Sequence, residues 1–187
     1  MKVLGIGGSP RKGGNTDILL EKCMQGAKDA GAETEVIFAR DLEMSGCREC
    51  NACSKTGVCA VKDGMSEVFG KFARMDALVI AAPVFFYSVP SGLKAVIDRC
   101  QSLWAQKYVL KKAPEPSKKG LFISVGGTRG ENLFSCVSLT MKYFFDVVGV
   151  KEWDTLFMRK IDAKAEILKY PDKLGEAYDL GRKLAAR

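Results

Sequence analysis

The sequence predicts an α/β protein: a three-layer sandwich around a five-stranded parallel sheet of strand order 2-1-3-4-5. Two observations support this prediction. Short apolar segments of strand length alternate with longer segments whose apolar residues recur at helical spacing. The segment ALVIAA at 77–82 is apolar throughout, as expected of a strand covered on both faces. The 187 residues fit one domain, and no internal repeat or linker divides them.

The first half of the chain predicts three strands and two helices. Residues 3–6 form an apolar run of strand length, and Asn15-Thr16 begins a helix whose apolar residues recur as far as Ala27. Gly31 marks the expected end of that helix. Residues 33–38 alternate loosely and predict the second strand, while a short helix at 65–74 precedes the third strand at 77–82.

The second half continues the alternation. A helix is predicted at 91–106, followed by a basic, proline-containing connection at 107–119 and a strand at 120–125. A strongly apolar helix at 132–148 leads into the fifth strand at 150–158, and Pro171 opens a last helix. This order is typical of a flavodoxin-like sheet. We therefore expect one flavodoxin-like domain over 1–187, with a cysteine-rich insertion at about 43–62.

The helix predicted at 132–148 carries apolar residues on more than one face, among them Leu139, Tyr143 and Phe144. A helix that is apolar nearly all round needs a second partner. Two interpretations stay open: a subunit interface, or deep burial within a single chain.

The glycine-rich turn at 7–16 is the first candidate binding site. A turn between a strand and a helix directs backbone N–H groups and the positive helix end at one point, which suits a phosphate. Gly8 to Gly13 has the glycine spacing of a Walker loop (GxxxxGK[ST]), but Gly14-Asn15 stands where that motif has Lys-Ser/Thr. The dinucleotide-binding pattern GxGxxG begins at Gly5 but ends in Pro10 instead of glycine. A phosphomonoester such as that of FMN is the remaining ligand. The candidate ligands of the phosphate are Ser9, Arg11, Lys12, Asn15 and Thr16.

Two further loops follow strands whose carboxyl ends lie at the same edge of the sheet. After the third strand, two prolines bracket an aromatic segment that can lie against a flat ring. Its candidate residues are Pro83, Val84, Phe85, Phe86, Tyr87 and Ser88. After the fourth strand, the run SVGGTRG lets the backbone approach a ligand closely. A loop that only covers the core is the alternative for the first segment, and a plain turn for the second.

The long loop before the helix at 65–74 holds Cys47, Cys50, Cys53 and Cys59 in the spacing C-x2-C-x2-C-x5-C. The spacing of the first three cysteines matches the compact ferredoxin signature, whereas the fourth follows after five residues instead of three and no proline follows Cys59. A single [4Fe–4S] cluster is the favoured interpretation. Zinc bound by four thiolates and reduced, unliganded thiols are the alternatives. The other cysteines, Cys23, Cys100 and Cys136, lie on predicted helices and are interpreted as small apolar residues.

Composition narrows the possible chemistry. The chain contains no histidine, which removes Ser-His and Cys-His catalysis and His-ligated zinc, so a cofactor is expected to supply the chemistry. The net charge of +7 is spread out and not interleaved with aromatic residues, which argues against nucleic-acid binding. No apolar run is long enough to span a membrane, and the N-terminus does not read as a signal peptide. With an odd count of seven cysteines, we expect a reducing, cytoplasmic location.

Four segments occur in an order that points to a known family: GSPRKGGNT, the cysteine run followed by KDGM, APVFFYSVPSGLKAVIDR and SVGGTRG. Together they resemble the iron–sulfur flavoproteins within the NADPH-dependent FMN reductase group. The resemblance implies that Ser9, Arg11, Asn15 and Thr16 hold the FMN phosphate. It also implies that Pro83 to Ser88 flank the isoalloxazine, with Ser124, Gly126 and Gly127 closing its other edge.

The same resemblance implies that the four loop cysteines ligate a [4Fe–4S] cluster. It implies a homodimer or homotetramer in which a cluster addresses a flavin across a subunit boundary. The expected function is electron transfer between the cluster, FMN and an external acceptor, with ferredoxin or a small molecule as partner. A cluster-free NAD(P)H-dependent FMN or quinone reductase is the second hypothesis. A zinc-stabilised binding module without flavin is the third.

Overall fold

A computed structural model of the protein describes residues 1–112 and 117–186. Its sheet has the strand order β2-β1-β3-β4-β5, and every neighbouring pair is parallel. This confirms the predicted fold class and strand order. The strands are β1 (Lys2–Gly7), β2 (Glu33–Phe38), β3 (Ala77–Pro83), β4 (Lys118–Gly126) and β5 (Val150–Arg159).

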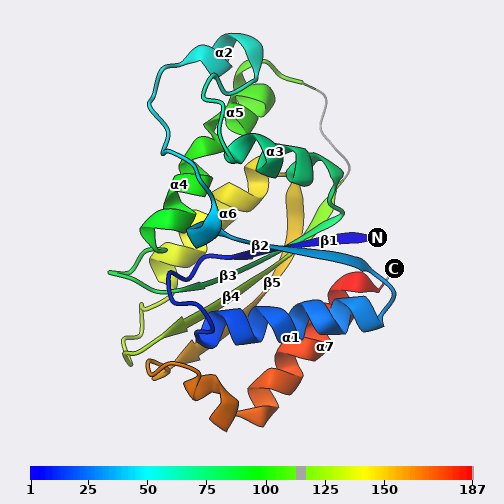
Figure 1. The fold of residues 1–187 in the computed structure, drawn as a ribbon, viewed down its shortest axis with the longest axis vertical. Coiled ribbons are helices and arrows are strands. Elements are labelled where there is room, and N and C mark those ends of the chain that lie inside the picture. The colour runs from blue at the N-terminus through cyan, green and yellow to red at the C-terminus, as the bar shows by residue number, and fades with distance from the viewer. Residues whose placement is uncertain (113–116, 187) are drawn as a thin grey trace.

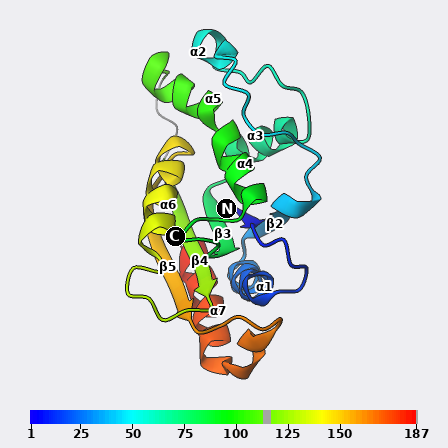
Figure 2. The same ribbon diagram turned by 90° about the vertical axis from the view of Figure 1, so that its left-hand side faces the viewer.

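Helices cover both faces of the sheet, as Figures 1 and 2 show. One face carries α1 (Asn15–Asp29) and α7 (Pro171–Ala185). The other carries α3 (Met65–Arg74), α4 (Ser91–Arg99), α5 (Gln101–Trp104) and α6 (Ser135–Val147). A short helix, α2 (Ala52–Thr56), lies in the cysteine-rich loop at the far end of the molecule from α1. Shorter turns are η1 (Ala39–Asp41), η2 (Ala105–Val109) and η3 (Glu166–Lys169).

The central strand explains why the core has two layers. Leu78, Ile80 and Ala82 of β3 face the α3–α6 layer, whereas Ala77, Val79 and Ala81 face α1 and α7. All six residues are fully buried. Because side chains alternate along a strand, an uninterrupted apolar run is what a strand between two helical layers requires.

Helices α1 and α7 approach each other through two glycines. A Cβ placed on Gly26 would lie 2.0 Å from the Tyr178 carbonyl oxygen, and one on Gly181 would lie 1.9 Å from that of Cys23. No side chain fits between the two backbones at these points. The tight contact fixes α1, and with it the turn that precedes the helix.

Two predicted helices differ from those observed. The single helix predicted at 91–106 is wrong: α4 ends at Arg99, α5 follows, and a π-helical turn, η2, extends to Val109. The Cys100 N–H donates to the Ile97 carbonyl, which makes a tightened turn where α4 meets α5. The helix predicted from residue 132 begins at Ser135. Part of the connection predicted at 107–119, residues 113–116, lies outside the described residues.

No helix in the described part of the chain is both long enough and apolar enough to cross a membrane.

Candidate functional site

Loops from four strands meet at the carboxyl edge of the sheet and enclose a cavity of about 280 Å³. They are the turn after β1, the aromatic segment after β3, the glycine run after β4 and the segment after β5. Predicted site residues in its wall are Ser9, Arg11, Asn15, Thr16, Pro83, Val84, Phe85, Gly126 and Gly127. This volume lies just below the roughly 300–1,000 Å³ of ligand pockets, so the cavity is large enough to enclose part of a small-molecule ligand.

The glycine-rich turn is organised by its own backbone. The Arg11 N–H donates to Ser9 Oγ at 3.1 Å, and the Gly14 N–H donates to the Arg11 carbonyl at 3.1 Å. Gly13 has a φ of +65°, a conformation that glycine adopts without strain. The turn ends at Gly14, the N-cap of α1, where the first N–H groups of the helix have no partner within it. An anion in the cavity can accept hydrogen bonds from these groups.

The Asn15 side chain is engaged elsewhere. Its Nδ2 donates to the Ala163 carbonyl at 2.9 Å, and its Oδ1 accepts the Ile167 N–H at 3.0 Å. Asn15 therefore joins the start of α1 to the segment after β5. Arg11 acts similarly, donating from Nη1 to the Asp162 carbonyl at 2.8 Å. Lys12 is exposed and does not line the cavity.

An ion pair that the sequence did not suggest supports this turn. Asp17, in the first turn of α1, is buried and accepts the Gly13 N–H at 3.0 Å. Arg40, just after β2, pairs with Asp17 at 2.9 Å and donates to the Ser9 carbonyl at 3.0 Å. An acidic residue in the first turn of a helix is a local signal for Asp17, but no local pattern marks Arg40 as its partner.

The aromatic segment after β3 forms a two-residue hairpin turn. Phe85 and Ser88 exchange two backbone hydrogen bonds of 2.8 Å, and Phe86 and Tyr87 at the tip have φ values of 49° and 60°. Two positive φ angles at the tip are the mark of a type I′ turn, which favours Asn-Gly. The Phe86 ring is fully exposed. The structure thus places Phe85 in the cavity wall, with Phe86, Tyr87 and Ser88 outside it.

The glycine run after β4 forms the opposite wall. A Cβ on Gly126 would come within 2.7 Å of a terminal methyl group of Leu133, so a larger residue here would make the Leu133 side chain shift. Gly127 is exposed and faces Asp162. Ser124 lies deeper, where its hydroxyl donates to the Ala82 carbonyl at 2.8 Å, and it does not line the cavity.

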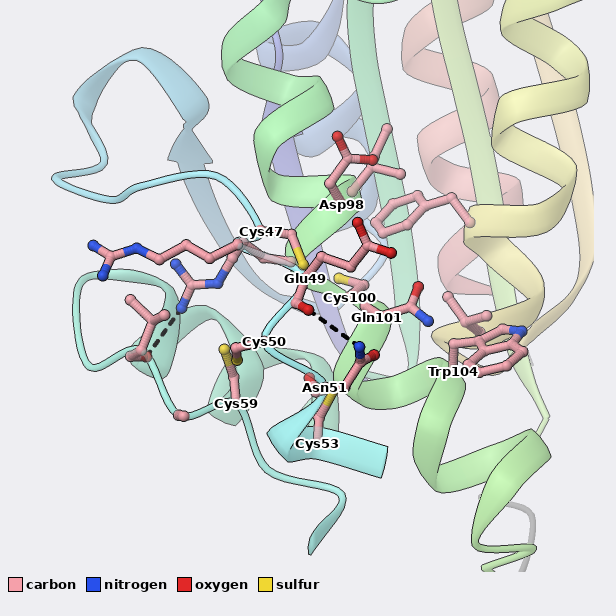
Figure 3. Close-up of a pocket in the computed structure, with 18 of the residues that line it drawn as sticks. Cys47, Glu49, Cys50, Asn51, Cys53, Cys59, Asp98, Cys100, Gln101 and Trp104 are labelled. Atoms are coloured by element: carbon pink, nitrogen blue, oxygen red, sulfur yellow. Dashed lines mark hydrogen bonds between the residues drawn. The ribbon is translucent and has the colours of Figure 1, made fainter. Parts of the chain in front are cut away.

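A second, larger cavity of about 580 Å³ lies between the cysteine-rich loop, the end of α4, α5 and α6. Cys47, Cys50, Cys53 and Cys59 all line it, as does Cys100 (Figure 3). Partial burial raises the pKa of the Cys53 thiol, and the charges of the other three loop thiols add to this rise. Among the described residues, no three ligating side chains are grouped so that they could hold a metal ion. The loop thus brings its four thiols to one cavity without closing them around a point.

Cys100 differs from the loop cysteines. It is buried, its thiol donates to the Val96 carbonyl, and burial raises its pKa. These features agree with its interpretation as a small apolar residue, as does the burial of Cys23. Cys136 is exposed, so the same interpretation is wrong there.

Comparison with known proteins identifies the family. The family model for NADPH-dependent FMN reductase matches residues 1–155. The chain belongs to this family. An iron-sulfur flavoprotein of Methanosarcina thermophila is 37% identical over 129 residues, which are 69% of this chain and 65% of the relative. The chain spans about half to two thirds of the length of the first curated relatives that it matches.

Two other relatives of this FMN reductase family member match nearly its full length. A putative NAD(P)H-dependent FMN-containing oxidoreductase of Bacillus subtilis, YwqN, is 28% identical over 93% of this chain and 100% of its own. The solved NAD(P)H:quinone oxidoreductase from Methanothermobacter marburgensis superposes with a TM-score of 0.80. It is 20% identical and covers 100% of this chain and 97% of its own, which shows a shared fold.

Proposed function

We propose that this chain is an iron–sulfur flavoprotein, an oxidoreductase that transfers electrons with FMN and a [4Fe–4S] cluster to or from an external partner. The observation that carries the proposal is the cysteine-lined cavity: four thiols in C-x2-C-x2-C-x5-C spacing line it, in a chain of the FMN reductase family. Four cysteines are the usual protein ligands of such a cluster. The family relatives named iron-sulfur flavoprotein support this assignment.

The residues around the smaller cavity fit FMN. The N-terminal N–H groups of α1 and the Ser9 hydroxyl suit the phosphate, while Arg11 contributes positive charge beside it. Asn15 holds the turn in place through the segment after β5. Pro83, Val84 and Gly127 present backbone and small apolar surface to a planar ring. When bound, FMN supplies one- and two-electron redox chemistry, and the chain orients it and controls access to it.

The four thiols of the larger cavity are the kind of ligand that an iron–sulfur cluster requires. Cys47 and Cys50 are exposed, and Cys53 and Cys59 are half-buried, so a cofactor can reach all four. We propose a cytoplasmic location, because the odd count of seven cysteines argues against a disulfide framework. Ferredoxin and small-molecule acceptors are the proposed partners, and NAD(P)H is a proposed donor.

One preparation tests the proposal. The protein is purified without oxygen, and its FMN, iron, acid-labile sulfide and zinc are measured per chain. The expected result is one FMN, four iron and about four sulfide, with a broad absorption band that bleaches on reduction. Protein that contains FMN but neither iron nor sulfide contradicts the cluster, and one zinc per chain assigns the cysteines to that metal instead.

A second candidate function is a cluster-free NAD(P)H-dependent FMN or quinone reductase. The exposed aromatic turn beside the smaller cavity favours it, because a planar donor or acceptor can stack on such rings. The Bacillus subtilis relative, named as NAD(P)H-dependent, supports it as well. Rapid bleaching of bound flavin by NADPH or NADH, with no change when all four loop cysteines are replaced by serine, selects this function. Bleaching that requires reduced ferredoxin and the cysteines selects the first.

A further inference from the structure

The buried Arg99 side chain at the end of α4 contacts the cysteine-rich loop at three separate points. Its Nη1 donates to the Ser45 carbonyl at 2.8 Å and to Asp63 Oδ2 at 2.7 Å. Its Nη2 donates to the Val61 carbonyl at 3.0 Å. The side chain of Arg99 is completely shielded from solvent. An arginine is rarely buried in this way unless it is paired and hydrogen-bonded.

The three contacts lie on either side of the cysteines. Ser45 precedes the first of them, Cys47, whereas Val61 and Asp63 follow the last, Cys59. Asp63 strengthens this closure because its carboxylate also accepts the Ser45 N–H at 3.0 Å and the Met65 N–H at 3.1 Å. The two ends of the cysteine segment are therefore joined through one guanidinium and one carboxylate, while the thiols between them stay accessible.

Arg99 also lies close to the cysteines between these two ends. Arg99 lines the same cavity as the four thiols. Burial lowers the pKa of Arg99, but the carboxylate of Asp63 and the nearby thiol of Cys59 raise it more, so the group stays charged. Its Nε–H is buried and has no acceptor among the described residues, which leaves one donor unused.

We propose that Arg99 is the positioning residue of the cysteine loop: it closes the ends of the loop before a cluster binds and places a positive charge in the wall of the cavity that the four thiols line. Closing the ends in advance lowers the conformational entropy that binding costs. A cation next to a thiolate ligand stabilises the more negative, reduced state of a cluster and raises its reduction potential. This inference rests on the proposed function for the cluster, but the closure of the loop does not.

Three variants distinguish the anchoring of the loop by Arg99 from the effect of its positive charge. Arg99→Gln removes both, Arg99→Lys keeps the charge but loses the fork of donors, and Asp63→Asn removes the carboxylate and leaves Arg99 in place. Arg48→Gln is the matched control, because Arg48 is an exposed arginine of the same loop. FMN binding at the distant cavity reports whether each variant is folded.

The first measurement uses metal-free protein. Hydrogen–deuterium exchange is followed at the amides of Ser45 and Met65, which donate to Asp63. We expect exchange roughly 100-fold faster in Arg99→Gln, since loss of one partner of a buried ion pair is costly, and faster exchange in Asp63→Asn. Arg48→Gln should match the wild type. Wild-type exchange in Arg99→Gln overturns the anchoring role, and if Arg99→Gln does not fold, wild-type exchange in Arg99→Lys, which loses the fork of donors, overturns it instead.

The second measurement uses protein reconstituted with iron and sulfide. We expect the reduction potential to fall in Arg99→Gln, to stay near the wild-type value in Arg99→Lys, and to change less in Arg48→Gln. Equal potentials in Arg99→Gln and the wild type overturn the charge role. Wild-type protein that takes up no iron overturns the proposed function instead, and the exchange experiment still decides whether Arg99 closes the loop.

Discussion

Asp17 and Arg40 form an ion pair of 2.9 Å that joins the first turn of α1 to the segment after β2. Their side chains are 2% and 14% exposed, so water screens the pair weakly. Asp17 also accepts the Gly13 N–H, and Arg40 also donates to the Ser9 carbonyl. The pair therefore fixes both ends of the glycine-rich turn that lines the smaller cavity.

Replacing Arg40 by methionine should destabilise the protein and weaken FMN binding. The change leaves the Asp17 carboxylate buried without its cation, which costs about 3 kcal/mol or more. Urea unfolding gives the stability, and quenching of FMN fluorescence gives the affinity. Lys12→Met is the control for stability: it removes a neighbouring exposed cation and should change the free energy of unfolding by less than about 0.5 kcal/mol. Equal stability of the two variants contradicts this role of the pair.

The candidate site was predicted from sequence where its signals are local. Ser9, Arg11 and the start of α1 lie within one short segment, so their meeting at one turn followed from the spacing. Asn15 shows the limit. It was predicted as a phosphate ligand, yet its side chain binds the backbone at Ala163 and Ile167. Contacts made across about 150 residues depend on how the helices pack, which no local pattern encodes.

Gly181 and Gly175 of α7 should respond oppositely to alanine. Gly181→Ala places a methyl group against the Cys23 carbonyl, so α1 and α7 must separate, and we expect a loss of about 1–3 kcal/mol. Gly175 has open space around its Cβ position, so Gly175→Ala should gain about 1 kcal/mol from helix propensity. Thermal unfolding of both variants measures the difference. A stable Gly181→Ala variant is incompatible with the close approach of the two helices.

The fold was more predictable than the site because its pattern repeats along the chain. The β2 bounds and the α3 bounds match the prediction residue for residue. The break between α4 and α5 was missed. Leu93, Val96, Cys100 and Leu103 continue one apolar stripe across it, so periodicity alone gives no sign of the tightened turn at Cys100.

The Asp63 carboxylate should make the cysteine loop sensitive to acid. The hydrogen bond from Arg99 lowers the pKa of Asp63 from 3.8 to about 2. Because the folded pKa lies below the unfolded one, the stabilisation is complete above about pH 4 and is lost as the pH falls toward 2. We expect the stability difference between wild type and Asp63→Asn to shrink over this range. Hydrogen exchange of metal-free protein from pH 5 to 2.5, corrected for intrinsic rates, measures it; a constant difference contradicts the pairing.

The turn at Phe86 and Tyr87 should gain stability and lose activity when it is given its preferred sequence. Both residues have positive φ angles, which cost non-glycine residues about 1 kcal/mol each, so Phe86→Asn with Tyr87→Gly should stabilise the protein. If the exposed rings hold a planar acceptor, the same variant should raise KM for a quinone while FMN stays bound. Phe86→Ala is the control, because it removes the ring without relieving the strain at Tyr87. Unchanged KM in both variants shows that the rings do not contact the acceptor.

The outer face of α6 should form a contact between subunits. Val137, Met141 and Phe144 are buried in the core, so the inner face needs no further partner. Leu139 and Tyr143 lie one turn apart on the opposite face and are 56% and 63% exposed. Because the helix has apolar residues on both sides, we expect a homodimer or homotetramer that Leu139→Glu dissociates.

Sedimentation equilibrium measures the mass of the wild type and of Leu139→Glu. Leu168→Glu is the control, since Leu168 is a leucine of similar exposure at η3, away from α6. It should leave the mass unchanged. An isologous interface brings the same residue of two subunits close together. The two carboxylates of Leu139→Glu would then be buried side by side and repel each other, which opposes association. A wild-type monomer, or an assembly that both glutamate variants preserve, assigns the exposed face of α6 to solvent.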